Sequence, residues 1–289
     1  MKNLLVSFSG GETSGFMCDW LIKNKSNDFK MLFAIANTSK EKEETLEFAN
    51  YCDKKFNLGL VWIESTFNEY KHTGYKITNF KDAKRNGEVF EDMIKCYGLP
   101  NTKYPHCTRE LKSEPLSKLA KDFLGDNWKA IGIRSDEIDR VSVSRVKNQL
   151  YYPLIESAHI TKQHVNLFWS KQERRLNLKG YEGNCNKCWK KSFRKLMTIE
   201  AEEKIKDDWW IDMENKYSNY IPKHRNRKEN NNKITFYRGN KSGLDIRDMS
   251  KLPFKKATDD TLDINTQESI FGVVLDKNDG CIGSCEPFI

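Results

Sequence analysis

Short hydrophobic runs alternate with stretches of helical periodicity along the first 175 residues of the chain. Buried strands are predicted at 4–8, 31–36, 58–63, 128–133 and 150–154. Helices are predicted after the first strand and at 43–56, 110–123 and 161–169, the last with Thr161 as its N-cap. Strands that alternate with helices in this way predict a parallel sheet joined by right-handed crossovers.

The hydrophobic pattern is weaker elsewhere. Residues 68–105 are predicted to form a loop and a helix over one edge of the sheet, and 195–217 one helical stretch. The polar run 223–233 is predicted to be a mobile loop. We therefore expect an α/β domain at 1–175, with a Rossmann-like doubly wound sheet of about five parallel strands. Residues 176–289 are expected to form a Cys- and Lys-rich cap with a flexible C-terminal tail.

Composition and charge narrow the class of protein. The chain has 289 residues, of which 38% are hydrophobic and 31% charged, as in a globular protein. It contains no run of about 18 apolar residues, and no signal-peptide pattern precedes the first strand. We expect a cytoplasmic protein that does not enter a membrane. The net charge of +8 fits either a Lys-rich solvated surface or an anionic partner, a nucleotide or a nucleic acid.

The turn after the first predicted strand has the composition of a phosphate-binding loop. Its sequence places Ser9, Gly10 and Gly11 before Thr13 and Ser14, and a predicted helix follows. Glycines let the backbone approach an anion, and the N–H groups and dipole of a helix N-terminus favour negative charge there. The two serine hydroxyls add donors. The sequence therefore predicts that this loop binds phosphate.

This loop resembles the motif of the PP-loop (adenine nucleotide alpha-hydrolase) superfamily, in which an Asp occupies the position of Thr13. Three later segments resemble the phosphoadenylyl sulfate (PAPS) and adenylyl sulfate (APS) reductase family within it. They are residues 37–48, 106–116 and 131–140. The resemblance implies an adenine nucleotide as substrate. The acidic residue helps to organise metal and pyrophosphate in members that use ATP, so Thr13 argues against ATP hydrolysis.

The same resemblance implies further nucleotide-binding residues. Beyond the loop, these are Asn37, Thr38, Lys112, Gly132, Arg134 and Arg140. Arginine suits this role because its planar guanidinium binds oxyanions through two parallel hydrogen bonds. Two alternatives remain open from the sequence. The arginines can pair with nearby acidic residues, and Lys112 can be a solvated helix residue.

The eight cysteines fall into two groups: three lie within helical patterns, and five lie among Gly, Pro, Asn and charged residues. Cys18, Cys52 and Cys96 lie within helical patterns and are predicted to be small buried hydrophobic residues. Cys185 and Cys188 form a CxxC motif in a Gly-rich segment. The flanking Lys187, Lys190 and Lys191 are predicted either to stabilise thiolates or an anionic cluster, or to form a solvated face.

APS reductases bind a [4Fe-4S] cluster through a Cys-Cys pair and a later CxxC, and this chain resembles them at Cys107, Cys185 and Cys188. His106 stands at the position of the first cysteine of the pair. The resemblance implies a cluster held by three thiolates, with a fourth ligand from His106, the tail or a substrate. Zinc in a Cys3His site is the alternative metal. A metal-free redox dithiol at Cys185 and Cys188 is the remaining alternative.

The C-terminal segment carries the remaining cysteines, Cys281 and Cys285. Reductases of the family have a catalytic cysteine on a mobile C-terminal segment, and the resemblance implies that role for Cys285, with Cys281 as a second catalytic candidate. The Cys285 thiolate would attack the sulfur, break the bond between that sulfur and the nucleotide phosphate, and release the nucleotide. A thioredoxin-like thiol carrier would then reduce the thiosulfonate left on the cysteine. The ending does not match the usual motif, so a terminal metal ligand or an inert thiol is the alternative.

Three functional hypotheses follow. The first is a PAPS/APS reductase-like enzyme of sulfur metabolism. The second is an ATP-dependent sulfur-transfer enzyme that thiolates tRNA or modifies DNA with phosphorothioate. The net charge and the basic run at 223–233 support this hypothesis. The third is a module that binds adenylates without catalysis.

Overall fold

The computed structural model describes residues 1–68, 72–183, 185–222, 233–264 and 287–288. Within them, six strands form one sheet. The strands are β1 (Lys2–Ser7), β2 (Phe29–Asn37), β3 (Val61–Phe67), β4 (Thr73–Thr78), β5 (Trp128–Ala130) and β6 (Leu150–Tyr151). The α-helices are α1 (Glu12–Lys25), α2 (Glu43–Phe56), α3 (Glu88–Tyr97), α4 (Glu114–Leu124), α5 (Pro153–Glu156), α6 (Lys162–Ser170), α7 (Phe193–Glu202), α8 (Trp209–Tyr217) and α9 (Gly243–Met249). Shorter turns are the π-helix η1 (Arg109–Ser113) and the 3-10 helices η2 (Ser135–Arg140) and η3 (Arg238–Asn240).

The sheet has the order β4-β3-β2-β1-β5-β6 and is parallel except for β4, which pairs antiparallel with β3. β1 is central because its Leu4, Leu5 and Val6 are apolar on both faces, and all three are fully buried. The chain returns to the other side of β1 after β3 and β4, so the order reverses between β1 and β5. Ligands of open α/β sheets bind beyond the carboxyl ends of the strands at such a switch point.

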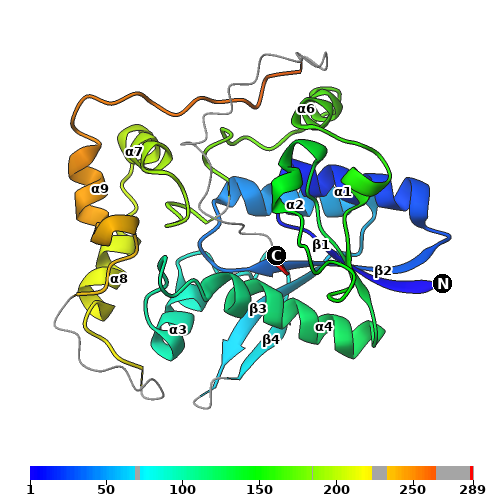
Figure 1. Cartoon of the computed structure of the whole chain (residues 1–289), viewed down its shortest axis with the longest axis horizontal. Helices are drawn as coiled ribbons and strands as arrows, with labels where there is room; N and C mark the ends of the chain where they lie inside the picture. Colours follow the sequence, from blue (N-terminus) through cyan, green and yellow to red (C-terminus); the bar gives the residue numbers. More distant parts are fainter. Residues whose placement is uncertain (69–71, 184, 223–232, 265–286, 289) are drawn as a thin grey trace.

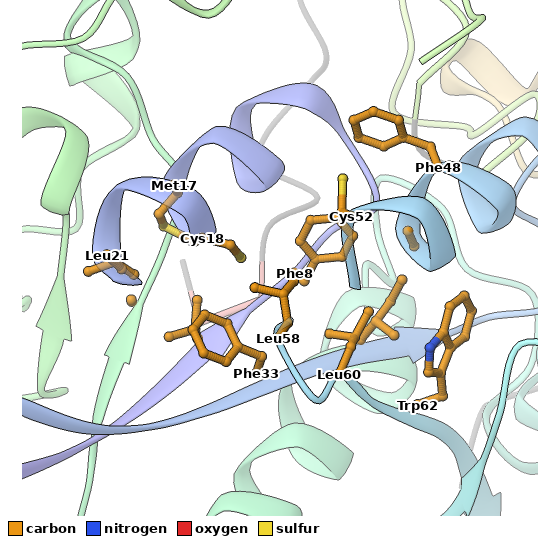
Figure 2. Close-up of a cluster of buried hydrophobic side chains, with 14 of the residues drawn as sticks. Phe8, Met17, Cys18, Leu21, Phe33, Phe48, Cys52, Leu58, Leu60 and Trp62 are labelled. Carbon is orange, nitrogen blue, oxygen red and sulfur yellow. The ribbon is translucent and has the colours of Figure 1, made fainter. Parts of the chain in front are cut away.

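Helices cover both faces of the sheet, as in a Rossmann-like doubly wound fold (Figure 1). α1, α2 and α6 pack on one face around a large hydrophobic cluster that contains Phe8, Phe48 and Trp169. Figure 2 shows part of this cluster, including Cys18 and Cys52, whose side chains point into it and are fully buried. α4 packs on the opposite face against Leu5, Ala34 and Ile63. The expected α/β class is confirmed.

A second large hydrophobic cluster lies beside the sheet and joins distant parts of the chain. It brings α3 together with α8 and α9, around Phe90, Trp210 and Phe236. In Figure 1, α7, α8 and α9 lie together at one side of the sheet. Cys107, Cys185 and Cys188 belong to this cluster and not to the core under α1 and α2.

The structure corrects several sequence predictions. Five strands of the sheet are parallel, as predicted, but a sixth strand, the antiparallel β4, lies within the segment predicted to be a loop and a helix. The stretch 195–217 is divided into α7 and α8, since the chain leaves the helical conformation at Glu203. Cys96 is only partly buried, whereas Cys18 and Cys52 are buried as predicted. The run 223–233 lies outside the described residues, except for Lys233.

No helix among the described residues combines the length and the apolar character needed to cross a bilayer.

Candidate nucleotide and cysteine site

The loop from Ser9 to Ser14 joins the end of β1 to the start of α1 and is closed by its own hydroxyl groups. The Ser9 backbone N–H and Oγ both donate to Ser14 Oγ, at 3.2 and 3.0 Å. Ser14 Oγ in turn donates to the Gly11 carbonyl at 2.8 Å. Gly10 has a φ of +81°, and a Cβ there would lie 2.5 Å from Thr45 Cγ2 of α2. Only glycine therefore fits this turn.

The loop is also held from the side of α6. Glu12 accepts hydrogen bonds from Arg175 Nε and Nη2, both at 2.9 Å, and its backbone carbonyl accepts one from Trp169 Nε1 at 2.8 Å. Glu12 is 9% exposed, so this ion pair lies largely out of water. Arg175 and Trp169 were not predicted as site residues, because nothing local in the sequence marks them as partners of a loop about 160 residues away.

Arg134 faces the phosphate loop across the switch point. Its Nη1 donates to Thr13 Oγ1 at 3.1 Å, and the backbone at Gly132 passes close to Ser14. Arg134 also pairs with Asp136 at 3.1 Å and with Glu137 at 3.2 Å. Arg140 pairs with Glu137 as well. Both arginines thus have the acidic partners that the sequence allowed, while Arg134 adds a direct contact to the loop.

The segment after β2 brings Asn37 and Thr38 to the same edge of the sheet. Asn37 Nδ2 donates to Glu64 Oε1 and to the Lys84 carbonyl, both at 2.8 Å. Thr38 Oγ1 donates to Glu41, with distances of 2.8 and 2.9 Å to the two carboxylate oxygens. Thr38 Oγ1 also lies 3.4 Å from Cys185 Sγ. This contact joins the loops at the sheet edge to the cysteine segment.

Cys107, Cys185 and Cys188 line one pocket. The first precedes η1 and the others precede α7, so residues nearly 80 positions apart in the sequence meet there. Thr38, Thr108 and Lys112 are the polar lining residues, and the walls are Phe90, Leu111, Trp189 and Trp210. The aromatic walls were not predicted from the sequence, although Trp189 directly follows Cys188 and is the one local sign of them.

His106 adjoins Cys107 without lining this pocket. Its Nε2 lies 3.0 Å from the Gly98 carbonyl, and its ring packs beside Tyr97. Within the described part of the chain, no group of three or more His, Cys, Asp or Glu side chains has the arrangement of a ready metal site. Cys281 and Cys285 lie outside the described residues.

The lysines of the cysteine segment do not form a solvated face. Lys187, Lys190 and Lys191 are 4%, 6% and 1% exposed. Lys187 pairs with Glu200 and Glu203, whereas Lys190 Nζ donates to Thr108 Oγ1 at 3.0 Å. Lys191 donates to the carbonyls of Gly183 and Cys185. These lysines tie the cysteine segment to its surroundings.

The fold and the site together define a doubly wound α/β protein with a glycine loop at its switch point and a cysteine-lined pocket beside that loop. The chain belongs to the family of the uncharacterized nin region protein ORF290 of Escherichia phage lambda. The two proteins share 31% identity over 202 residues, which cover 66% of this chain and 67% of the phage protein.

A second relative is an uncharacterized protein of Methanocaldococcus jannaschii, MJ0066. It is 26% identical over 239 residues, which cover 77% of this chain but only 43% of the archaeal protein. No protein-family model matches the chain.

Proposed function

We propose that this protein is a PAPS/APS reductase-like enzyme that binds an adenine nucleotide at the Ser9–Ser14 loop and performs thiol-dependent sulfur chemistry beside it. One observation carries the proposal: three cysteines from distant segments line one pocket, and Thr38, at the carboxyl edge of the sheet, contacts Cys185. A nucleotide held by its phosphates at the switch point lies at the same edge of the sheet as this pocket.

The charges around the loop support an anionic substrate. Arg134 lies against Thr13 and carries two acidic partners, which an incoming phosphate can replace in part. Lys112 lines the cysteine pocket and supplies a cation there. In the proposed reaction these residues bind and orient the anionic groups of the nucleotide, and the aromatic walls of the pocket exclude water.

The three cysteines of the pocket support an iron–sulfur cluster as the proposed cofactor. Cys107, Cys185 and Cys188 would supply three thiolates, and Lys190 beside Thr108 adds a buried positive charge. Such a cluster supplies electron transfer or an open iron for sulfur. The same three thiolates with a fourth donor suit zinc. The nucleophilic role of Cys285 stays a prediction from the resemblance.

The first test is the metal content. Protein purified without oxygen is expected to contain iron and acid-labile sulfide, and Cys188→Ser is expected to lose both. Zinc without iron in the wild type would overturn the cluster and leave the nucleotide site untouched.

The second test is the reaction. Sulfite release from adenylyl sulfate or its 3′-phosphorylated form is measured with thioredoxin and its reducing system. Release is expected in the wild type and at background level in Cys285→Ser. Equal release by both proteins would remove Cys285 from the mechanism, and no release from either nucleotide would contradict the proposed reaction.

An enzyme that transfers sulfur to nucleic acid is the second candidate. The pocket favours it because three cysteines leave one metal position for sulfide, and the net charge is +8. Thr13 at the position of the motif Asp opposes it. RNA or DNA retained at high salt, together with ATP-dependent incorporation of labelled sulfur into that nucleic acid, would favour this candidate over the reductase.

A further inference from the structure

The turn between Cys185 and Cys188 contains a lysine in an unfavourable backbone conformation. Lys187 has a φ of +49°, in the left-handed region that side chains other than those of Gly, Asn and Asp seldom adopt. It is also 4% exposed. A residue persists in this conformation only where its surroundings determine it.

Three groups hold the Lys187 ammonium. Lys187 Nζ lies 2.5 Å from Glu200 Oε2 and 2.7 Å from Glu203 Oε2, and it donates to the Asp207 carbonyl at 3.1 Å. Glu200 lies in the last turn of α7 and is 3% exposed, and Glu203 directly follows the end of this helix. The turn is therefore fastened to α7 by an ion cluster that has little contact with water.

The neighbouring residue extends the same cluster. Asn186 Nδ2 donates to Glu203 Oε1 and to Asp207 Oδ2, both at 3.0 Å. Asp207 pairs with Lys40 at 3.0 Å, and the Asn186 backbone N–H donates to the Lys40 carbonyl at 2.8 Å. Both residues between the two cysteines are thus fixed, one through its ammonium and the other through its amide.

Stability alone is a weak reason for this arrangement. A buried ion pair contributes little net stability compared with apolar side chains of the same size, because both charges lose their hydration. What it does supply is one defined geometry. Here that geometry is the turn that carries Cys185 and Cys188 to the pocket wall.

We propose that Lys187 is a positioning residue: its ion cluster with Glu200 and Glu203 holds the Cys185–Cys188 turn in the left-handed conformation and thereby presents both sulfur atoms to the pocket. This inference rests on the proposed role of the pocket. It predicts that loss of the cluster affects these two cysteines and spares Cys107, which lies on another segment.

The test compares three variants with the wild type. Lys187→Met removes the ammonium and keeps most of the stem. Lys187→Met/Glu203→Gln also removes one carboxylate charge, which restores the charge balance and protects folding. Lys206→Met is the matched control, because Lys206 is a cation of the same cluster, 3.8 Å from Glu200 and 40% exposed, that lies outside the turn.

Two measurements are made on each metal-free protein. Alkylation by iodoacetamide is followed cysteine by cysteine by mass spectrometry. Binding of Zn²⁺ is measured by competition with a chromogenic chelator. In both Lys187 variants we expect Cys185 and Cys188 to react about tenfold faster, with the Cys107 rate unchanged. Zn²⁺ affinity should fall by about 10- to 100-fold, as for other supports of metal ligands. Lys206→Met should match the wild type.

A double variant with the alkylation rates and Zn²⁺ affinity of the wild type would overturn the proposal. If neither Lys187 variant folds, the single variant Glu203→Gln replaces them, because Lys187 still has Glu200 as an ion-pair partner in it. Alkylation of Cys185 and Cys188 is then expected to be faster than in the wild type. An unchanged alkylation rate would contradict the proposal. A wild type that binds neither iron nor Zn²⁺ would refute the metal in the proposed function, while the alkylation rates still test the positioning of the turn.

Discussion

At the scale of single residues, Gly10 is the position where the phosphate loop tolerates the least change. Gly10→Ala would place its Cβ 2.5 Å from Thr45 Cγ2 and keep a φ of +81°. We expect the variant to lose about 2–4 kcal/mol of unfolding free energy, from backbone strain plus overpacking. It should also lose nucleotide binding, because the loop must move away from α2. Urea unfolding and titration with AMP and adenylyl sulfate measure the two effects.

Gly59 offers a matched control for this substitution. It too has a positive φ, of +62°, but a Cβ there meets nothing within 4 Å. Gly59→Ala should therefore show only the backbone strain, about 1–2 kcal/mol, and should bind nucleotide like the wild type. If Gly10→Ala binds nucleotide as tightly as Gly59→Ala does, the Ser9–Ser14 loop is not the nucleotide site.

Residues also differ in how far the sequence revealed their roles. The phosphate loop was predictable because its glycines, its hydroxyls and the strand before it are contiguous. The partners of Lys187 were not predictable, because Glu200 and Glu203 are distant from it in the sequence. A sequence does not show whether a charged side chain is solvated or forms a buried ion pair. The contact between Thr38 and Cys185 was equally hidden, since it joins residues 147 positions apart.

At the scale of elements, Glu214 of α8 predicts an unusual dependence of stability on pH. It is 6% exposed and accepts hydrogen bonds from the backbone N–H groups of Phe236 and Gly243, at 2.8 and 2.7 Å. Burial raises the pKa of Glu214 from 4.5 to about 7, although both hydrogen bonds act to lower it. The carboxyl group thus ionises in the unfolded chain before it ionises in the folded one.

This order of ionisation fixes the sign of the effect. Between pH 4.5 and 7 the folded state keeps a proton that the unfolded state has lost, so the contribution of Glu214 to stability declines as the pH rises. The full decline is about 3 kcal/mol. Measured by urea unfolding from pH 5 to pH 8, Glu214→Gln should gain stability relative to the wild type as the pH rises.

Glu202 provides the control for this pH series. Hydrogen bonds from Lys179 and Tyr181 lower the pKa of Glu202 to about 2, so it is ionised in both states throughout the range from pH 5 to pH 8. Glu202→Gln should shift the stability by a constant amount across this range. Parallel curves for wild type and Glu214→Gln would show that Glu214 does not titrate in the folded protein.

The elements differ in how well their patterns predicted them. In α2, Leu46, Ala49 and Cys52 recur at helical spacing and are all buried, so periodicity alone found the helix. In β4, the alternation of Tyr75, Lys76 and Ile77 is too short to mark a strand, and Ile77 is exposed at the sheet edge instead of buried in a core. Its backbone pairing with β3 stabilises it, and a single sequence does not display such pairing.

At the scale of the whole molecule, the proposed nucleotide loop and the cysteine pocket pack on two different hydrophobic clusters. The phosphate loop rests on the cluster beneath α1 and α2, which is built from the sheet. The cysteine pocket rests on the cluster of α3, α8 and α9. The segment from Thr38 to Glu41 connects them, through Thr38 and Cys185 on one side and the start of α2 on the other.

This division predicts which parts of the protein lose stability when a bound metal is removed. A metal ligated by Cys107, Cys185 and Cys188 would fasten the segment before η1 to the segment before α7, and its binding energy would add to the stability of that region. Chelation should therefore raise amide hydrogen exchange about tenfold or more across 185–217 and leave β1 and β2 as protected as before. Mass spectrometry of exchanged peptides resolves the two regions.

Cys107→Ser gives the internal comparison, because it removes one ligand and leaves the Lys187 turn in place. The metal-loaded wild type and this variant should differ across 185–217 and agree in β1 and β2, whereas the chelated wild type should match the variant in both regions. If chelation changes the whole chain uniformly, the two clusters unfold as one unit. If it changes nothing in a protein shown to carry metal, the metal is bound elsewhere than between these three cysteines.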